Sequence, residues 1–270
     1  MEFHTFGNRS RKAVILVHGV MTPWQIWEPI AQTLSREYYV VIPALDGHVE
    51  EYPSPFLSLA DEVQQIERYI RKHLQGEVHA LCGLSMGGAV CWEIYTRGIC
   101  RVEHLVMDGA PLIPMPGILR SVMTRQYIHI LRQSRCRSPR LLNNFTRYFL
   151  PEQYLIPFLK IMDLLEEESI QAMIRDVGAG QSIAGGSPET GILYFYGTTL
   201  NERYSLKTGR KLRKAYPQAK ITALPGYSHG ELTIYHPELW LQHVRAFLGA
   251  GSERSAGPVT GKLKYRTENG

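Results

Sequence analysis

The chain has 270 residues, a formal net charge of +5 and 44% hydrophobic residues. This length suits one large α/β domain or a domain that carries an inserted subdomain. The apolar content excludes disorder over most of the chain, and no stretch reaches the roughly 18 consecutive apolar residues of a membrane-spanning helix. Residues Met1 to His4 contain no basic segment ahead of an apolar one, so we expect a cytoplasmic protein without a secretory signal.

Charge and cysteine content exclude further kinds of site. The basic excess is mild and no Lys/Arg run has the form of a nucleic-acid-binding arm, so we expect no nucleic-acid partner. The cysteines have no CxxC spacing, and they predict neither a zinc site nor a disulfide framework. They are Cys82, Cys91, Cys100 and Cys136.

Short apolar runs alternate with longer helical patterns over the first part of the chain. Strands are expected at 13–17, 39–42, 78–82 and 104–107, and helices at 24–36, 57–74 and 86–97. Repeated strand–helix–strand units of this kind predict an α/β fold with a mostly parallel central sheet flanked by helices.

After Pro111 the apolar residues follow a helical period instead. We expect a helical cap inserted at 112–190, with a kink at Pro157, and two more strands at 191–196 and 220–224. Helices are expected at 205–216 and 237–248. The predicted division is therefore a core of 1–111 and 191–248, a cap of 112–190, and a flexible tail of 249–270.

The strongest chemical signal is Gly83-Leu84-Ser85-Met86-Gly87, which directly follows a predicted strand and precedes a helical pattern. A serine on so sharp a strand-to-helix turn has a strained backbone, and small neighbours are needed for the chain to fit. The turn exposes the Ser85 hydroxyl near a helix N-terminus, where negative charge on a substrate is favoured. The motif predicts a nucleophile elbow.

A serine hydroxyl is a poor nucleophile until a base accepts its proton. His229 is the best placed of the ten histidines, because it lies in Gly226-Tyr227-Ser228-His229-Gly230 just after the last predicted strand. A loop at that position can carry an imidazole over the same edge of the sheet.

With these motifs the sequence resembles the α/β-hydrolase superfamily, and within it the small serine esterases and lipase-like members with a helical cap. The resemblance covers residues 10 to 248. Besides the two motifs above, it includes Val17-His18-Gly19 and the segment Pro237-Glu238-Leu239-Trp240. It implies an α/β-hydrolase fold with a sheet of about eight strands, a triad in the order serine, acid, histidine, and a cap that lines the acyl pocket. It does not identify the substrate.

An oxyanion hole requires two backbone N–H donors. Met86, which follows the nucleophile, is expected to provide one. The resemblance implies that the other comes from the loop after the first long strand, and we assign it to Val20, with Met21 as the alternative. His18 and the segment Asp46-Gly47-His48 are interpreted as structural.

The acid departs from the pattern that the resemblance implies. The position that usually holds an Asp is Leu200, which cannot orient an imidazole. Two carboxylates remain: Asp108, at the end of an earlier strand, and Glu202, two residues beyond the empty position. We favour Asp108 over Glu202, with a dyad supported by Asn201 or water as a third alternative.

The sequence thus predicts a serine hydrolase that cleaves carboxylic esters of small to medium, mostly apolar acyl groups through an acyl-enzyme, without a metal or organic cofactor. Alternatives are an acyl-CoA thioesterase or acyltransferase, a C–C bond hydrolase on the same residues, and a non-catalytic ligand-binding scaffold. A small-molecule ester is the expected partner, without stable membrane insertion. The cap also carries seven arginines and no acid between Ile118 and Tyr148, which indicates either attraction of anionic substrates or a solvated basic face. They are Arg120, Arg125, Arg132, Arg135, Arg137, Arg140 and Arg147.

Overall fold

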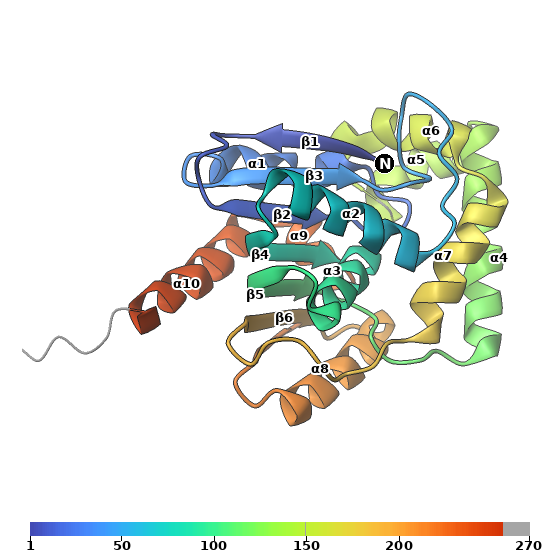
Figure 1. Cartoon of the computed structure of the whole chain (residues 1–270). Coiled ribbons are helices and arrows are strands. Elements are labelled where there is room, and N and C mark those ends of the chain that lie inside the picture. The colour runs from blue at the N-terminus through green and yellow to red at the C-terminus, as the bar shows by residue number, and fades with distance from the viewer. Residues whose placement is uncertain (149, 256–270) are drawn as a thin grey trace, which may run out of the picture.

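A seven-stranded sheet forms the centre of the part of the chain that the computed structural model describes, residues 1–148 and 150–255. The strand order is β1-β3-β2-β4-β5-β6-β7, and every neighbouring pair is parallel except β1 with β3 (Figure 1). The strands are β1 Glu2–Phe6, β2 Ala13–Val17, β3 Tyr39–Ala44, β4 Glu77–Leu84, β5 Arg101–Asp108, β6 Gly191–Gly197 and β7 Lys220–Leu224. This confirms the predicted α/β class, with one strand fewer than the resemblance implied among the described residues.

The central strands form because their residues are apolar on both faces. All residues of β2 and β3 are buried, as expected for parallel strands covered by helices on each side. The antiparallel β1 was not among the expected strands. It is a short edge strand of mostly half-buried residues that pairs from Glu2 opposite Ala44 to Phe6 opposite Val40.

Helices cover both faces of the sheet (Figure 1). In the core, α2 packs against α3, and α1 packs against α10. Trp27, the last residue of η1 directly before α1, contacts Trp240 of α10 edge to face, with ring centroids 5.4 Å apart. The core helices are η1 Trp24–Trp27, α1 Glu28–Leu34, α2 Leu59–His73, α3 Met86–Arg97, η3 Leu200–Glu202, α8 Arg203–Ala215, α9 Glu231–Tyr235 and α10 Pro237–Ser255.

A group of helices lies between β5 and β6 in the chain, where the sequence predicted the cap. They are α4 Gly117–Arg135, α5 Pro139–Tyr148, η2 Glu152–Tyr154, α6 Leu155–Leu164 and α7 Glu167–Ala179. Helix α4 packs against α6 and α7, and α7 packs back against α2 and α3. Pro157 falls in the first turn of α6, where its missing N–H costs no intrahelical hydrogen bond.

Three of the seven cap arginines hold these helices together. Arg132 forms a two-pronged ion pair with Glu167, at 2.7 and 2.8 Å, and Arg137 pairs in the same way with Asp163. The Arg135 guanidinium donates to two carbonyl oxygens at the end of α6, those of Met162 and Leu165. These side chains therefore have a structural role at the C-terminal end of α4.

The last helix is longer than expected. Helix α10 continues past Leu248 to Ser255. The expected helix end at 248 is therefore wrong: the first residues of the predicted tail, 249–255, belong to α10, and its remaining part, 256–270, lies outside the described residues. None of the described helices combines the length and the apolar content that crossing a membrane requires.

Candidate active site

Ser85 occupies a strained turn between β4 and α3. Its backbone has φ 53° and ψ −116°, far from the conformations that a side chain prefers. Two glycines make the turn possible. A Cβ on Gly87 would lie 2.2 Å from the Val17 carbonyl oxygen, and one on Gly83 would lie 2.3 Å from the Gly87 carbonyl oxygen. The Ser85 N–H donates to the Asp108 carbonyl at 2.8 Å, which fixes the turn against β5.

His229 reaches the same edge of the sheet from the loop after β7. Its ring lies on Gly109, directly after β5, because a Cβ there would come within 2.7 Å of His229 Cε1. Gly230 lies next to the Leu84 side chain, one residue before Ser85. The side chain of His229 is 38% exposed, so the ring borders open space. The structure thus brings both predicted residues to the carboxyl ends of β4 and β5, although it contains no Ser85–His229 hydrogen bond among the described residues.

The carboxylate that contacts His229 is Glu202. His229 Nδ1–H donates to Glu202 Oε1 at 2.5 Å, and the Glu202 side chain is only 1% exposed. Asp108 is engaged elsewhere, because its Oδ2 accepts a hydrogen bond of 2.6 Å from Thr233 Oγ1. The preference for Asp108 as the partner of His229 is therefore corrected. The geometry supports Glu202 as the partner of His229. Glu202 is the last residue of η3, two residues beyond the exposed Leu200.

Electrostatics distinguish the two acids. Burial alone would raise the pKa of Glu202, but the hydrogen bond and charge of His229 outweigh it and hold the pKa below its usual value, with help from Ser205 and the Gly197 amide. Burial raises the pKa of Asp108 to about 6, although the Thr233 hydrogen bond opposes the shift. Glu202 is the carboxylate whose ionised form the site stabilises.

The same pair makes His229 a stronger base. Burial lowers the pKa of the imidazole, but the hydrogen bond and charge of Glu202 and the charge of Asp108 outweigh this and raise it above 6.5. With its proton fixed at Nδ1 by Glu202, the neutral ring has its free electron pair at Nε2. An imidazole in this tautomer can accept a proton from a hydroxyl.

Two buried histidines shape the loop after β2. His48 Nε2 accepts the Met21 N–H at 2.9 Å, and His18 Nε2 accepts the Leu45 N–H at 3.1 Å. Burial lowers the pKa of His48 to about 4 and that of His18 well below its usual value, so both rings stay neutral. His18 and His48 therefore have structural positions, in line with their interpretation from the sequence.

This network leaves the Val20 amide of the loop available for a ligand. Met21, the alternative oxyanion donor, has its N–H occupied by His48 and a strained φ of 54°. The Val20 N–H has no protein acceptor among the hydrogen bonds of the described residues. Met86 is the first residue of α3, and the first N–H groups of a helix lack intrahelical partners. The geometry thus favours Val20 and Met86 as the pair of donors.

The tryptophans that the sequence placed near the loop have other neighbours. Trp27 is fully buried against Trp240, and Trp24 stacks on His4 with ring centroids 3.8 Å apart. Trp27 therefore packs against α10, and Trp24 packs against β1.

A possible metal-ligand cluster lies far from this site. Among the described residues, His79, Glu103 and His104 have ligand atoms within 4.8 Å of one another at the opposite ends of β4 and β5. Glu103 already binds Lys12 Nζ at 3.0 Å and His79 Nδ1 at 2.6 Å. Glu103 is therefore engaged in ion pairs with Lys12 and His79, which His104 does not join.

Comparisons with known proteins agree with the architecture. The model of the alpha/beta hydrolase family matches residues 14–242. No curated protein matches the chain in sequence. A solved structure from Desulfitobacterium hafniense, assigned to the alpha/beta hydrolase family, is 21% identical with a TM-score of 0.71, over 92% of this chain and 100% of that one. A thermophilic esterase from Thermogutta terrifontis is 19% identical (TM-score 0.67, 93% of each chain). An enol-lactonase from Burkholderia xenovorans is 18% identical (TM-score 0.68, 92% of this chain and 96% of that one). At these identities the likeness concerns the fold.

Proposed function

The chain belongs to the alpha/beta hydrolase family, and from this premise we propose that it is a serine hydrolase that cleaves carboxylic esters through an acyl-enzyme. The observation that carries the proposal is the convergence of a strained Ser85 and of His229, hydrogen-bonded to the buried Glu202, at one edge of the sheet. The structural relatives with esterase and lactonase activity in their names add support for ester chemistry.

In the first half-reaction His229 Nε2 accepts the proton of the Ser85 hydroxyl while the oxygen attacks the ester carbonyl. Glu202 keeps the other ring proton on Nδ1 and stabilises the imidazolium that forms. The N–H groups of Val20 and Met86 stabilise the negative oxygen of the tetrahedral intermediate. His229 then gives its proton to the leaving alcohol, and the Ser85 acyl ester remains.

In the second half-reaction water replaces the alcohol. His229 accepts a proton from water, the hydroxide attacks the acyl carbonyl, and the proton returns to Ser85 as the acid leaves. Each step uses the same oxyanion donors, so the chain's own residues suffice for the cycle.

We assign the helices between β5 and β6 to a cap that borders the acyl group, with the core at 1–111 and 191–248. The position of these helices in the chain supports the assignment, because the segment that leads from β5 to α4 begins at Gly109, against which His229 lies. Helices α4 and α6 carry apolar residues that belong to the hydrophobic core, among them Leu131 and Phe158, and this composition supports apolar acyl groups of small to medium size.

The proposal is tested by hydrolysis of p-nitrophenyl esters of increasing acyl length, with acyl-CoA thioesters of the same lengths in parallel. We expect ester turnover in the wild type and a loss of at least about 10³-fold in kcat for Ser85→Ala. A folded wild-type protein that hydrolyses neither class contradicts the proposal. A strong preference for the thioesters replaces the ester assignment by a thioesterase.

A further inference from the structure

Helix α8 carries an unusual concentration of positive charge. Every ionisable Lys or Arg on it is exposed, and the helix contains no acidic residue. None of these cations forms an ion pair among the described residues. They are Arg203, Lys207, Arg210, Lys211, Arg213 and Lys214. Basic groups near a helix C-terminus are favoured by the helix dipole, but this accounts only for the last turn.

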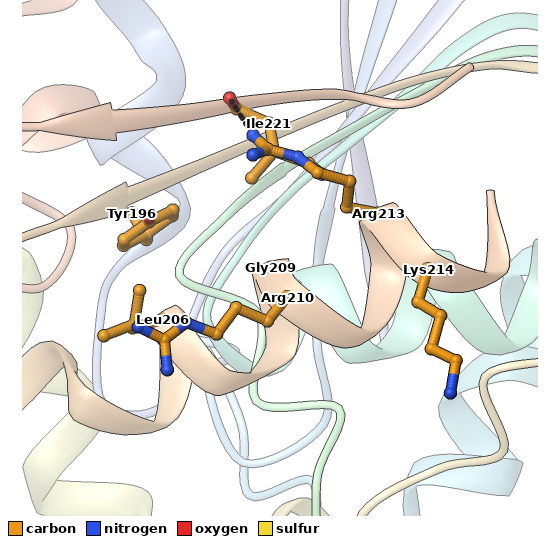
Figure 2. A pocket seen from close by; sticks show the side chains of 7 residues that line it. All are labelled: Tyr196, Leu206, Gly209, Arg210, Arg213, Lys214 and Ile221. Carbon is orange, nitrogen blue, oxygen red and sulfur yellow. Dashed lines mark hydrogen bonds between the residues drawn. The ribbon is translucent and has the colours of Figure 1, made fainter. Parts of the chain in front are cut away.

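Three of these cations line a hollow between α8 and the strands β6 and β7 (Figure 2). The hollow has a volume of about 460 Å³, and its lining contains three cations, one aromatic ring and no carboxylate. The lining residues are Tyr196, Leu206, Gly209, Arg210, Arg213, Lys214 and Ile221.

The floor of the hollow is apolar and close-packed. A Cβ on Gly209 would lie 3.1 Å from Ile221 Cγ2 and 3.3 Å from Tyr196 Cε1, so the glycine lets α8 approach β6 and β7. The Tyr196 side chain is only half-buried, which leaves part of it accessible beside Leu206. This floor can accept a flat apolar group.

The rim supplies donors for an anion. Figure 2 shows Arg210 reaching along α8 toward Leu206, while Arg213 reaches across to β7. Arg213 Nη2 donates to the Ile221 carbonyl at a long 3.4 Å, which holds the guanidinium at the rim and leaves its other N–H groups available. The guanidinium groups of Arg210 and Arg213 lie on either side of Tyr196 in Figure 2, and each suits the oxygens of a phosphate group, which accept paired hydrogen bonds.

We propose that this hollow binds a nucleoside phosphate, with its phosphates at Arg210 and Arg213 and its base against Tyr196. The volume exceeds what a phosphate ion alone fills, and the aromatic floor supplies a stacking surface of the kind that bases use. A free nucleotide and the nucleotide end of coenzyme A present the same chemistry. The site is independent of the hydrolase proposal, because it uses neither Ser85 nor His229.

The test is isothermal titration of the full chain with ADP, with coenzyme A and with inorganic pyrophosphate. We expect saturable binding of ADP, of coenzyme A or of both with 1:1 stoichiometry, and pyrophosphate binding at least about tenfold weaker. Binding of both indicates a general nucleotide site. Binding of one alone identifies the source of the nucleotide.

The double variant Arg210→Ala/Arg213→Ala should raise Kd by about tenfold or more, because it removes charge-assisted hydrogen bonds. The matched control is Lys207→Ala/Lys211→Ala, which removes the same charge from the same helix outside the hollow, and its Kd should change by less than about threefold. Thermal unfolding verifies that both variants fold. The proposal is overturned if neither nucleotide binds, if pyrophosphate binds as tightly as they do, or if the control loses as much affinity as the rim variant.

Discussion

Replacement of Glu202 by Gln gives the sharpest prediction about the active site. The change keeps the length of the side chain but removes the charge that faces His229 Nδ1 at 2.5 Å. Because Glu202 is 1% exposed, water cannot take its place. The amide can also donate to Nδ1, which selects the tautomer with the proton at Nε2, where the Ser85 proton must be accepted. We expect kcat to fall by about 10³- to 10⁴-fold, equivalent to about 4–5.5 kcal/mol of transition-state stabilisation.

The matched control is Asp108→Asn, the same carboxyl-to-amide change in the acid that the sequence had favoured. Its new carbonyl oxygen can still accept the Thr233 hydroxyl, so kcat should stay within about tenfold of wild type. The assay is steady-state hydrolysis of one p-nitrophenyl ester by the three proteins. A large loss in Asp108→Asn together with a loss below about tenfold in Glu202→Gln would refute the assignment.

The pH dependence of kcat/KM gives a second test of Glu202→Gln. His229 must be neutral to accept a proton, and its folded-state pKa is raised above 6.5, so kcat/KM of the wild type should fall as the pH drops through a value above 6.5. Glu202 supplies the largest share of the forces that raise this pKa. The residual kcat/KM of Glu202→Gln should therefore begin to fall only at a lower pH than that of the wild type. An unchanged pH of this fall would contradict the claim that Glu202 raises the pKa of His229.

Three further predictions concern positioning and stability. His48→Ala leaves a buried N–H of the oxyanion loop without an acceptor, and kcat should fall by about 10- to 100-fold with little change in KM, as measured by steady-state kinetics. Gly87→Ala should prevent folding, since its Cβ would lie 2.2 Å from a carbonyl oxygen, whereas Gly98→Ala has open space and should cost about 1 kcal/mol for its positive φ, as urea unfolding would show. Asp108→Asn should gain stability relative to wild type as the pH rises from 4 to 8. The pKa near 6 in place of 3.8 means that the folded wild type loses up to about 3 kcal/mol over that range, and equal pH dependence of both melting temperatures would contradict this.

The elements that the sequence predicted well are those with local causes. The apolar runs of β2 to β7 and the glycines around Ser85 fix their conformation through neighbours in the chain. The helix from Met86 to Arg97 was predicted with the bounds that the structure shows. The sequence analysis missed strand β1 because its residues, Glu2 to Phe6, form no clear apolar run. The strand is stabilised by its pairing with β3.

The choice of the acid depends on contacts that no local pattern reveals. Glu202 is 27 residues from His229 in the chain, and the bend of η3 is what directs its longer side chain to the ring. Thr233, which donates a hydrogen bond to Asp108, is 125 residues away from it in the chain. The role of His48 at Met21 likewise comes from two separate loops, and the sequence indicated only that the segment Asp46-Gly47-His48 is structural.

The central claim is that Ser85 is activated by His229, and a fluorophosphonate probe tests it most directly. Such a reagent forms a covalent bond with an activated serine, and mass spectrometry of the digested protein locates the adduct. We predict labelling of wild type on the peptide that contains Ser85, no labelling of Ser85→Ala, and labelling slowed by at least about 10³-fold in a folded His229→Gln variant. Folded wild-type protein that stays unlabelled, or labelling that persists in Ser85→Ala at the same rate, would contradict the account.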